Sequence, residues 1–296
     1  MDMSVLLFLA PPFVASLVIA GIHAYLGIHV VERGVIFVDL SLAQIAAFGA
    51  TIALLMPWSG GDPHGNAAYW TSLAFTFLGA AIFATIRSRR ARIPQEAIIG
   101  ISYAVASAAT ILAMSKSTSE GEHLKDMLVG NILAVSWSEV GLTALLYGVI
   151  GVFHFIFRRR FLAISMDPER AEADGMSLRF WDFLFYASFG FVVTRSVSIA
   201  GVLLVFCYLI VPSVAAMLYS DRIGKRLAIG WAMGTIVSAL GVYLSLQLDL
   251  PTGATIVCTF GLVLIIMAAV RPLIQRNAPV DVDQMKYVNR AHSPSH

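Results

Sequence analysis

The feature that most constrains this chain is a series of uninterrupted apolar stretches, each about 20 residues long, which is the length a helix needs to cross a bilayer. The stretches are continuous and lack the roughly 10-residue alternating pattern of a membrane β-barrel. Only 13% of the residues are charged, which is too few to cover a water-soluble surface, and 58% are hydrophobic, which is more than a soluble core can bury. The sequence therefore predicts an all-α, polytopic membrane protein.

Hydropathy predicts about nine membrane-spanning helices. Eight are also possible, because the sixth and seventh are separated by almost nothing around the RSVS segment, Arg195 to Ser198. We expect residues 1–275 to form one transmembrane domain and residues 276–296 to form a polar cytoplasmic tail. The predicted spans cover residues 5–28, 35–57, 69–87, 95–115, 138–157, 180–195, 198–219, 227–247 and 254–272.

The distribution of basic residues predicts the orientation in the membrane. Cytoplasmic loops near span ends are enriched in Lys and Arg. With the N-terminus outside and the C-terminus in the cytoplasm, nine spans place all but three of the 20 basic residues on the cytoplasmic side; the exceptions are Lys116, Lys125 and Arg195. The first apolar stretch lacks a basic region before it and a clear cleavage site, so we expect a retained span.

The second span carries polar residues at membrane depth: Asp39, Ser41 and Gln44. Asp39 and Gln44 are five positions apart, about 140° around a helix, whereas Ser41 and Gln44 share a face. Asp39 is either an interfacial acid in the first helical turn, close to Arg33, or part of a polar transport path. Gln44 either makes a hydrogen bond between helices or lines the same path.

Other polar residues occur at or within the spans. Asp249 precedes a Pro and a Gly near an outer span end, where it is either a turn or cap residue or an acidic group at the outer mouth of a path that Gln247 extends inward. His23 and His154 are single histidines within spans, which we interpret as packed and hydrogen-bonded side chains.

The long loop at 158–179 contains a sequence typical of a short helix. Asp167 is in position to cap its first turn, Pro168 suits the first helical position, and Gly175 suits its end. The segment is too polar to lie in the membrane. We therefore predict a cytoplasmic docking element for another protein.

Enzyme motifs are missing from the sequence. It has no GxxxxGK[ST], HExxH, GxSxG or CxxC pattern, so we expect a chain that is not an enzyme and a pathway driven by something else. The net charge of +2 points to no nucleic-acid partner, and Cys207 and Cys258 are interpreted as unreactive thiols in apolar surroundings.

Several segments occur in an order that is similar to a known family. They are QEAIIGISYAVASA, LVGNILAVSWSEV, DPERAEADGMS, SIAGVLLVFCYLIVPSVAAMLYSDR and GVYLSLQLDLPTGATIV. Together they resemble the membrane permease of the zinc/manganese/iron ABC importer family, over nearly the whole chain.

The resemblance implies a type II ABC importer permease fold in the bacterial inner membrane, working as a homodimer or similar pair. It implies a separate cytoplasmic ABC ATPase that uses ATP, an extracytoplasmic metal-binding protein, and no cofactor bound by this chain. Asp249 matches an acid of the family, so Asp39 and Asp249 are the candidate transient metal ligands. The residues implied to couple to the ATPase are Asp167, Pro168, Glu169, Ala171 and Gly175.

The second span departs from the family pattern GD-x-x-SHA-x-x-PG, in which Asp and His lie four apart on one face. Aligned on Gly49, this chain has Leu40 and Gln44 at those positions; aligned on Asp39, it has Ala43 in place of His. An amide is a weaker zinc ligand than imidazole, which favours manganese or iron(II) over zinc. The alternatives are a secondary transporter with Asp39 and Asp249 as ion relays, or an ABC permease for a non-metal substrate.

Overall fold

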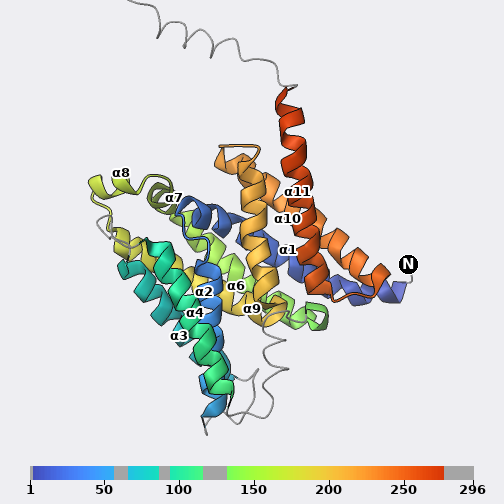
Figure 1. Ribbon diagram of the computed structural model, residues 1–296, viewed down its shortest axis with the longest axis horizontal. Coiled ribbons are helices and arrows are strands. Elements are labelled where there is room, and N and C mark those ends of the chain that lie inside the picture. Colours follow the sequence, from blue (N-terminus) through green and yellow to red (C-terminus); the bar gives the residue numbers. More distant parts are fainter. Residues whose placement is uncertain (1–2, 57–65, 87–93, 116–131, 277–296) are drawn as a thin grey trace, which may run out of the picture.

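The computed structural model describes residues 3–56, 66–86, 94–115 and 132–276. Over these ranges the chain folds into helices joined by short connections, with no β-strand among the described residues (Figure 1). The predicted cytoplasmic tail lies outside the described residues except for Arg276, where the last helix ends.

Eight of the described helices are long and apolar enough to cross a membrane. They agree with the predicted spans to within a few residues, which confirms the all-α, multi-pass prediction. Their bounds are α1 Met3–Glu32, α2 Val38–Leu55, α3 Asn66–Ile86, α4 Gln95–Met114, α6 Trp137–Ile156, α9 Leu178–Met217, α10 Ile223–Leu248 and α11 Thr252–Arg276. The short helices are η2 Ile132–Ala134, α7 Arg158–Met166 and α8 Pro168–Ala173.

Helix α9 accounts for the difference between nine predicted spans and eight helices. It has 40 residues and contains both predicted spans 180–195 and 198–219. At 1.5 Å per residue a straight helix of this length would be about 60 Å long, twice the hydrocarbon thickness. The backbone leaves helical geometry at Gly201 (φ 76°, ψ 162°). In Figure 1 the parts of α9 before and after this break run in different directions. Helix α9 therefore consists of two helical segments, one before and one after Gly201.

The predicted turn at Arg195 to Ser198 is wrong, because these residues are helical. The Arg195 side chain donates from Nε to Thr143 Oγ1 at 3.0 Å and from Nη2 to the carbonyl of Glu139 at 3.4 Å, both on α6. These bonds give the arginine partners inside the bundle, so the segment needs no loop. The break occurs at Gly201 because glycine alone adopts that combination of φ and ψ readily.

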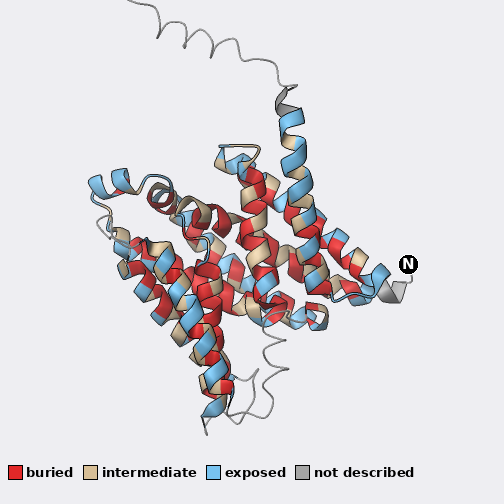
Figure 2. Ribbon diagram, in the orientation of Figure 1, coloured by how far each residue is buried: buried red, intermediate tan, exposed pale blue. Residues whose placement is uncertain are grey.

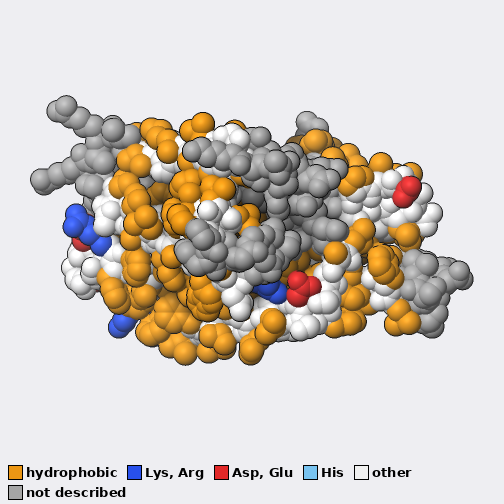
Figure 3. Space-filling model, turned by 90° about the horizontal axis from the view of Figure 1, so that it is seen from below, with side chains coloured by type: hydrophobic (Ala, Val, Ile, Leu, Met, Phe, Trp, Pro, Cys, Tyr) orange, Lys and Arg blue, Asp and Glu red, His pale blue; other side chains and the backbone are white. Residues whose placement is uncertain are grey.

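The core of the bundle is formed by α1, α2 and α9, whose buried residues are visible as the red parts of Figure 2. α9 packs on α1, α2, α3, α10 and α11, while α2 packs on α3, α4 and α9. The outward faces of α4, α6 and α11 expose large apolar side chains. Figure 3 shows a surface of mainly hydrophobic side chains with only small groups of charged ones. This distribution suits a rim in contact with lipid.

Candidate functional site

The predicted short helix in the 158–179 loop is present as α8. Asp167 accepts a hydrogen bond from the backbone N–H of Arg170 at 3.0 Å, and Pro168 occupies the first turn. Gly175 follows the helix with φ +83°, a conformation that favours glycine and ends the helix. The predicted capping of this helix is therefore confirmed, residue by residue.

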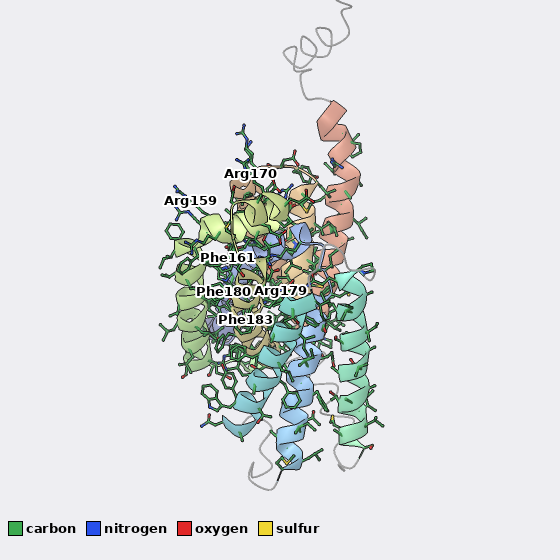
Figure 4. All side chains as sticks on the ribbon, turned by 90° about the vertical axis from the view of Figure 1, so that its left-hand side faces the viewer. Arg159, Phe161, Arg170, Arg179, Phe180 and Phe183 are labelled. Carbon is green, nitrogen blue, oxygen red and sulfur yellow. The ribbon has the colours of Figure 1, made fainter. Side chains whose placement is uncertain are left out.

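α8 lies at one end of the bundle, beside α7 (Figure 1). Ala171 is 1% exposed and faces the protein, whereas Glu169, Arg170 and Glu172 are exposed. Figure 4 shows Arg159 of α7 and Arg170 of α8 extending outward, while Phe161 lies among packed side chains. A short helix anchored on one small residue, with a charged outer face, can accept a partner protein.

The polar residues of α2 are all inside the bundle. Asp39, Ser41 and Gln44 are 1%, 0% and 6% exposed. Neither carboxylate oxygen of Asp39 has a hydrogen-bond partner among the described residues, and the Ser41 hydroxyl has none there either. Asp39 does lie in the first turn of α2, but it is buried and is not the partner of Arg33, which pairs with Asp182. The predicted place in the first turn is therefore confirmed, whereas a pairing with Arg33 is not seen.

Tyr147 links α6 to α9 inside the bundle. The Tyr147 hydroxyl donates to the carbonyl of Val192 at 3.1 Å and is hydrogen-bonded to Ser196. Sequence reasoning missed Tyr147 and Ser196, because single hydroxyl residues in apolar spans give no signal of what they face.

His23 extends this polar region on α1. It is fully buried, its Nδ1 lies 2.9 Å from the carbonyl of Ile19, and its ring centroid is 6.4 Å from that of Tyr147. His154 is also buried and contacts Ser188 Oγ at 2.8 Å. Both histidines are packed and hydrogen-bonded, as predicted. The second ring nitrogen of His23 has no partner among the described residues.

The predicted outer residues lie elsewhere. Asp249 ends α10 in a left-handed conformation (φ 52°, ψ 48°), so its interpretation as a cap residue is confirmed. Gln247 and Asp249 are both exposed, and α10 runs away from α2 toward the end where the chain starts (Figure 1). Within the described ranges no group of three or more His, Cys, Asp or Glu could hold a metal. A transient metal site using Asp39 and Asp249 stays a prediction.

A buried ionic network was not predicted at all. Arg33, at the end of α1, donates from Nη1 to Asp182 Oδ1 of α9 at 2.6 Å and from Nε to Ser165 Oγ of α7 at 2.8 Å. His29 Nδ1 lies 2.8 Å from the same hydroxyl. The paired residues of α1 and of α7 or α9 are more than 130 positions apart in the chain, so no local sequence pattern predicts these contacts.

Comparison with known proteins agrees with this architecture. The sequence profile of the ABC 3 transport family matches residues 6–271. The chain is 24% identical over 250 residues to the manganese transport system membrane protein MntC of Listeria innocua, covering 84% of this chain and 86% of the relative. It is 26% identical over 242 residues to the chelated iron transport system membrane protein YfeC of Yersinia pestis, covering 82% and 79%.

Among solved structures, PsaBC from Streptococcus pneumoniae in complex with Fab matches with a TM-score of 0.73 and 23% identity, over 88% of this chain and 90% of the matched chain. That likeness confirms the fold. The family profile covers nearly all of the sequence and includes α2, α8 and α10. The chain therefore belongs to the ABC 3 transport family, as a multi-pass membrane subunit of an ABC transporter whose ATPase is a separate chain.

Proposed function

We propose that this chain is the permease subunit of an importer for a divalent metal, manganese or iron(II). The observation that carries the proposal is the carboxylate of Asp39, which is buried and has no hydrogen-bond partner among the described residues. An acid inside a membrane span is costly to keep, which is why such residues mark ion pathways. The names of the relatives, a manganese and a chelated-iron transport protein, support the same class of substrate.

The available ligand atoms favour harder ions. Carboxylate, hydroxyl and amide oxygens from Asp39, Ser41 and Gln44 suit manganese and iron(II) better than zinc, for which imidazole or thiolate is preferred. A small number of oxygen ligands, with only one carboxylate among them, also holds an ion weakly. Weak binding suits passage, since a tight site would retain the ion in the path.

The transport cycle that we propose is alternating access between two helical bundles of a homodimer. A cytoplasmic ATPase engages the exposed face of α8, which carries Glu169, while Asp167, Pro168 and Gly175 shape the helix and the buried Ala171 anchors it; an extracytoplasmic metal-binding protein delivers the ion. α7, α8, the α9–α10 connection and the end of α11 lie at the same end of the bundle in Figure 1. Arg158, Arg222 and Arg271 come from these segments, which supports that end as cytoplasmic.

The location that follows is the bacterial inner membrane, with the N-terminus outside. Residues 1–275 form the membrane domain of this arrangement, and residues 276–296 form a cytoplasmic tail. Asp249 and Gln247 stand at the outer end of α10, where they belong to the outer mouth of the path. Labelling single introduced cysteines with a membrane-impermeant reagent in whole cells tests the orientation.

Uptake by the reconstituted permease and ATPase tests the substrate. With manganese(II), iron(II) and zinc(II) presented separately, we expect ATP-dependent uptake of the first two and less of the third. Gln44→His adds an imidazole on the face that carries Ser41 and is expected to raise zinc uptake relative to manganese. Gln44→Ala removes the amide without adding imidazole, so it serves as the control and should not raise zinc uptake.

The secondary-transporter alternative predicts a different outcome. Uptake would then follow a membrane potential in vesicles that contain this chain alone, without ATP or an ATPase. The family match favours the ABC mechanism. Potential-driven uptake by the isolated chain, together with no ATPase in the purified complex, would overturn the proposal.

A further inference from the structure

The side chain of Arg33 is buried at the junction between the membrane helices and the docking helix. It is 1% exposed, and its partner Asp182 is 0% exposed. The guanidinium donates to Asp182 and Ser165, and its carbon lies 4.0 Å from the ring centroid of Phe185. Two directed hydrogen bonds and a stacked ring define one position for this group.

The two acceptors lie on either side of α8 in the chain. Ser165 is in the last turn of α7, two residues before the capping Asp167. Asp182 is in the second turn of α9, the helix that follows Gly175. One arginine side chain therefore holds both ends of the segment that carries α8.

On its other side, Arg33 leads directly into α2. Gly34 adopts φ +67° in the turn that follows, and the backbone N–H of Phe37 donates to Glu96 Oε1 of α4 at 3.0 Å. Asp39 comes six residues after Arg33, in the first turn of α2. The turn is thus tied to α7 and α9 at its start and to α4 at its end.

A buried ion pair of this kind moves as a unit. Separating the charges inside the protein would leave each without compensation, which is strongly unfavourable. Closely packed interiors transmit a displacement and do not absorb it. A shift of α8 therefore carries Ser165 and Asp182 with it, and through them Arg33 and the start of α2.

We infer that Arg33 is a positioning residue that transmits the displacement of α8 to α2 and so repositions Asp39 in the transport path. The inference rests on the proposed function, because it takes α8 as the contact with the ATPase and Asp39 as a path residue. Arg33 touches neither partner nor substrate. Its role is to convert movement at the docking helix into movement at the buried carboxylate.

The test compares transport with ATP hydrolysis in the full transporter, reconstituted with its ATPase and binding protein. Arg33→Lys keeps a positive charge next to Asp182, so the pair stays compensated, but it loses the planar fork and the bond to Ser165. Ser165→Ala is the milder second variant and removes only the hydroxyl. The measured quantity is the number of manganese(II) ions imported per ATP hydrolysed.

The neighbouring residue Glu32 provides a matched control. It pairs with Arg226 of α10, so it ties the same end of α1 to a helix outside the α7–α8 segment. Glu32→Gln breaks that pair without touching Ser165 or Asp182. It should leave the ratio of manganese to ATP within about twofold of the wild type.

For Arg33→Lys we expect the ratio to fall about tenfold, within the usual range of coupling between two sites, while the assembled transporter still hydrolyses ATP. For Ser165→Ala we expect a smaller fall, about threefold, the size expected for losing one hydrogen bond. A purely structural role lowers transport and hydrolysis together and leaves their ratio unchanged, which would overturn the inference. An equal fall in the ratio for Glu32→Gln would also overturn it. If the wild type itself imports no manganese, the proposed function fails, and the two failures are thus distinguishable.

Discussion

Two buried aspartates with different surroundings provide the sharpest test of the structure. Asp182 accepts a hydrogen bond from Arg33 and is 0% exposed, while Asp39 is 1% exposed and has no hydrogen-bond partner among the described residues. Asparagine has nearly the same size as aspartate and carries no charge. We therefore expect Asp182→Asn and Asp39→Asn to change the free energy of unfolding in opposite directions.

The expected magnitudes follow from these surroundings. Asp182→Asn leaves the buried guanidinium of Arg33 without its counter-charge, a loss of about 3–5 kcal/mol. Asp39→Asn removes an acid whose cost in a span is about 2.5–3.5 kcal/mol on insertion scales, but the amide is itself polar, so the net gain is about 1–2 kcal/mol. At about 2 °C per kcal/mol for a chain of this size, Tm falls by about 6–10 °C in the first variant and rises by about 2–4 °C in the second.

The assay is thermal unfolding of the purified transporter followed by tryptophan fluorescence. All variants need the same detergent and one scan rate, because unfolding of such proteins is commonly irreversible. A chelator in every sample removes metal ions, whose binding would stabilise the wild type. Manganese(II) uptake is measured in parallel and should fall in Asp39→Asn although its Tm rises.

A fall in Tm for Asp39→Asn comparable to that of Asp182→Asn would refute this reasoning. It would mean that the carboxylate of Asp39 stabilises the fold through a partner, as Asp182 does. Unchanged uptake in a stabilised Asp39→Asn variant would instead remove Asp39 from the transport path and leave the stability argument intact.

Three further outcomes are expected. Glu169→Arg reverses a charge on the exposed face of α8 and should abolish coupled manganese uptake while Tm and residual ATP hydrolysis remain, measured in proteoliposomes; unchanged coupling would refute the role of α8. Gly201→Ala forces a side chain into a conformation that essentially only glycine adopts and should cost about 1–3 kcal/mol, seen as a lower Tm. Gly27→Ala places a Cβ against the carbonyl of Leu209 and should lower the yield of folded protein, whereas Gly21→Ala faces open space and should behave as wild type.

Local signals explain why much of the fold could be predicted. A span is recognisable because about 20 apolar residues in a row have few other folds available. Seven of the membrane-length helices each match one predicted span, and α9 contains the remaining two. The capping of α8 was equally accessible, since Asp167, Pro168 and Gly175 act on neighbouring backbone groups. The resemblance to an ABC importer permease was confirmed because its segments are spread along the whole chain.

The prediction failed where a residue's partner is distant in sequence. Arg195 and its serine neighbours were interpreted as a turn, yet the segment is helical, and Thr143 and Glu139 of α6 accept hydrogen bonds from the Arg195 side chain inside the bundle. Arg33 read as a basic residue at a membrane boundary and a neighbour of Asp39, yet it pairs with Asp182, 149 positions away. A hydropathy scale assigns each residue its own free-energy cost of entering the membrane. It does not include the partner side chain that can offset this cost.

The amino-acid sequence by itself determined the helical membrane class, most span positions, the short helix α8 and the family, because these depend on runs and motifs of adjacent residues. Only the tertiary structure decided which buried charges are compensated. Whether an acid in a membrane span is structural or free to meet an ion depends on which side chains approach it from other helices. Here that approach gives Asp182 an arginine and leaves Asp39 without a hydrogen-bond partner in the described part of the chain.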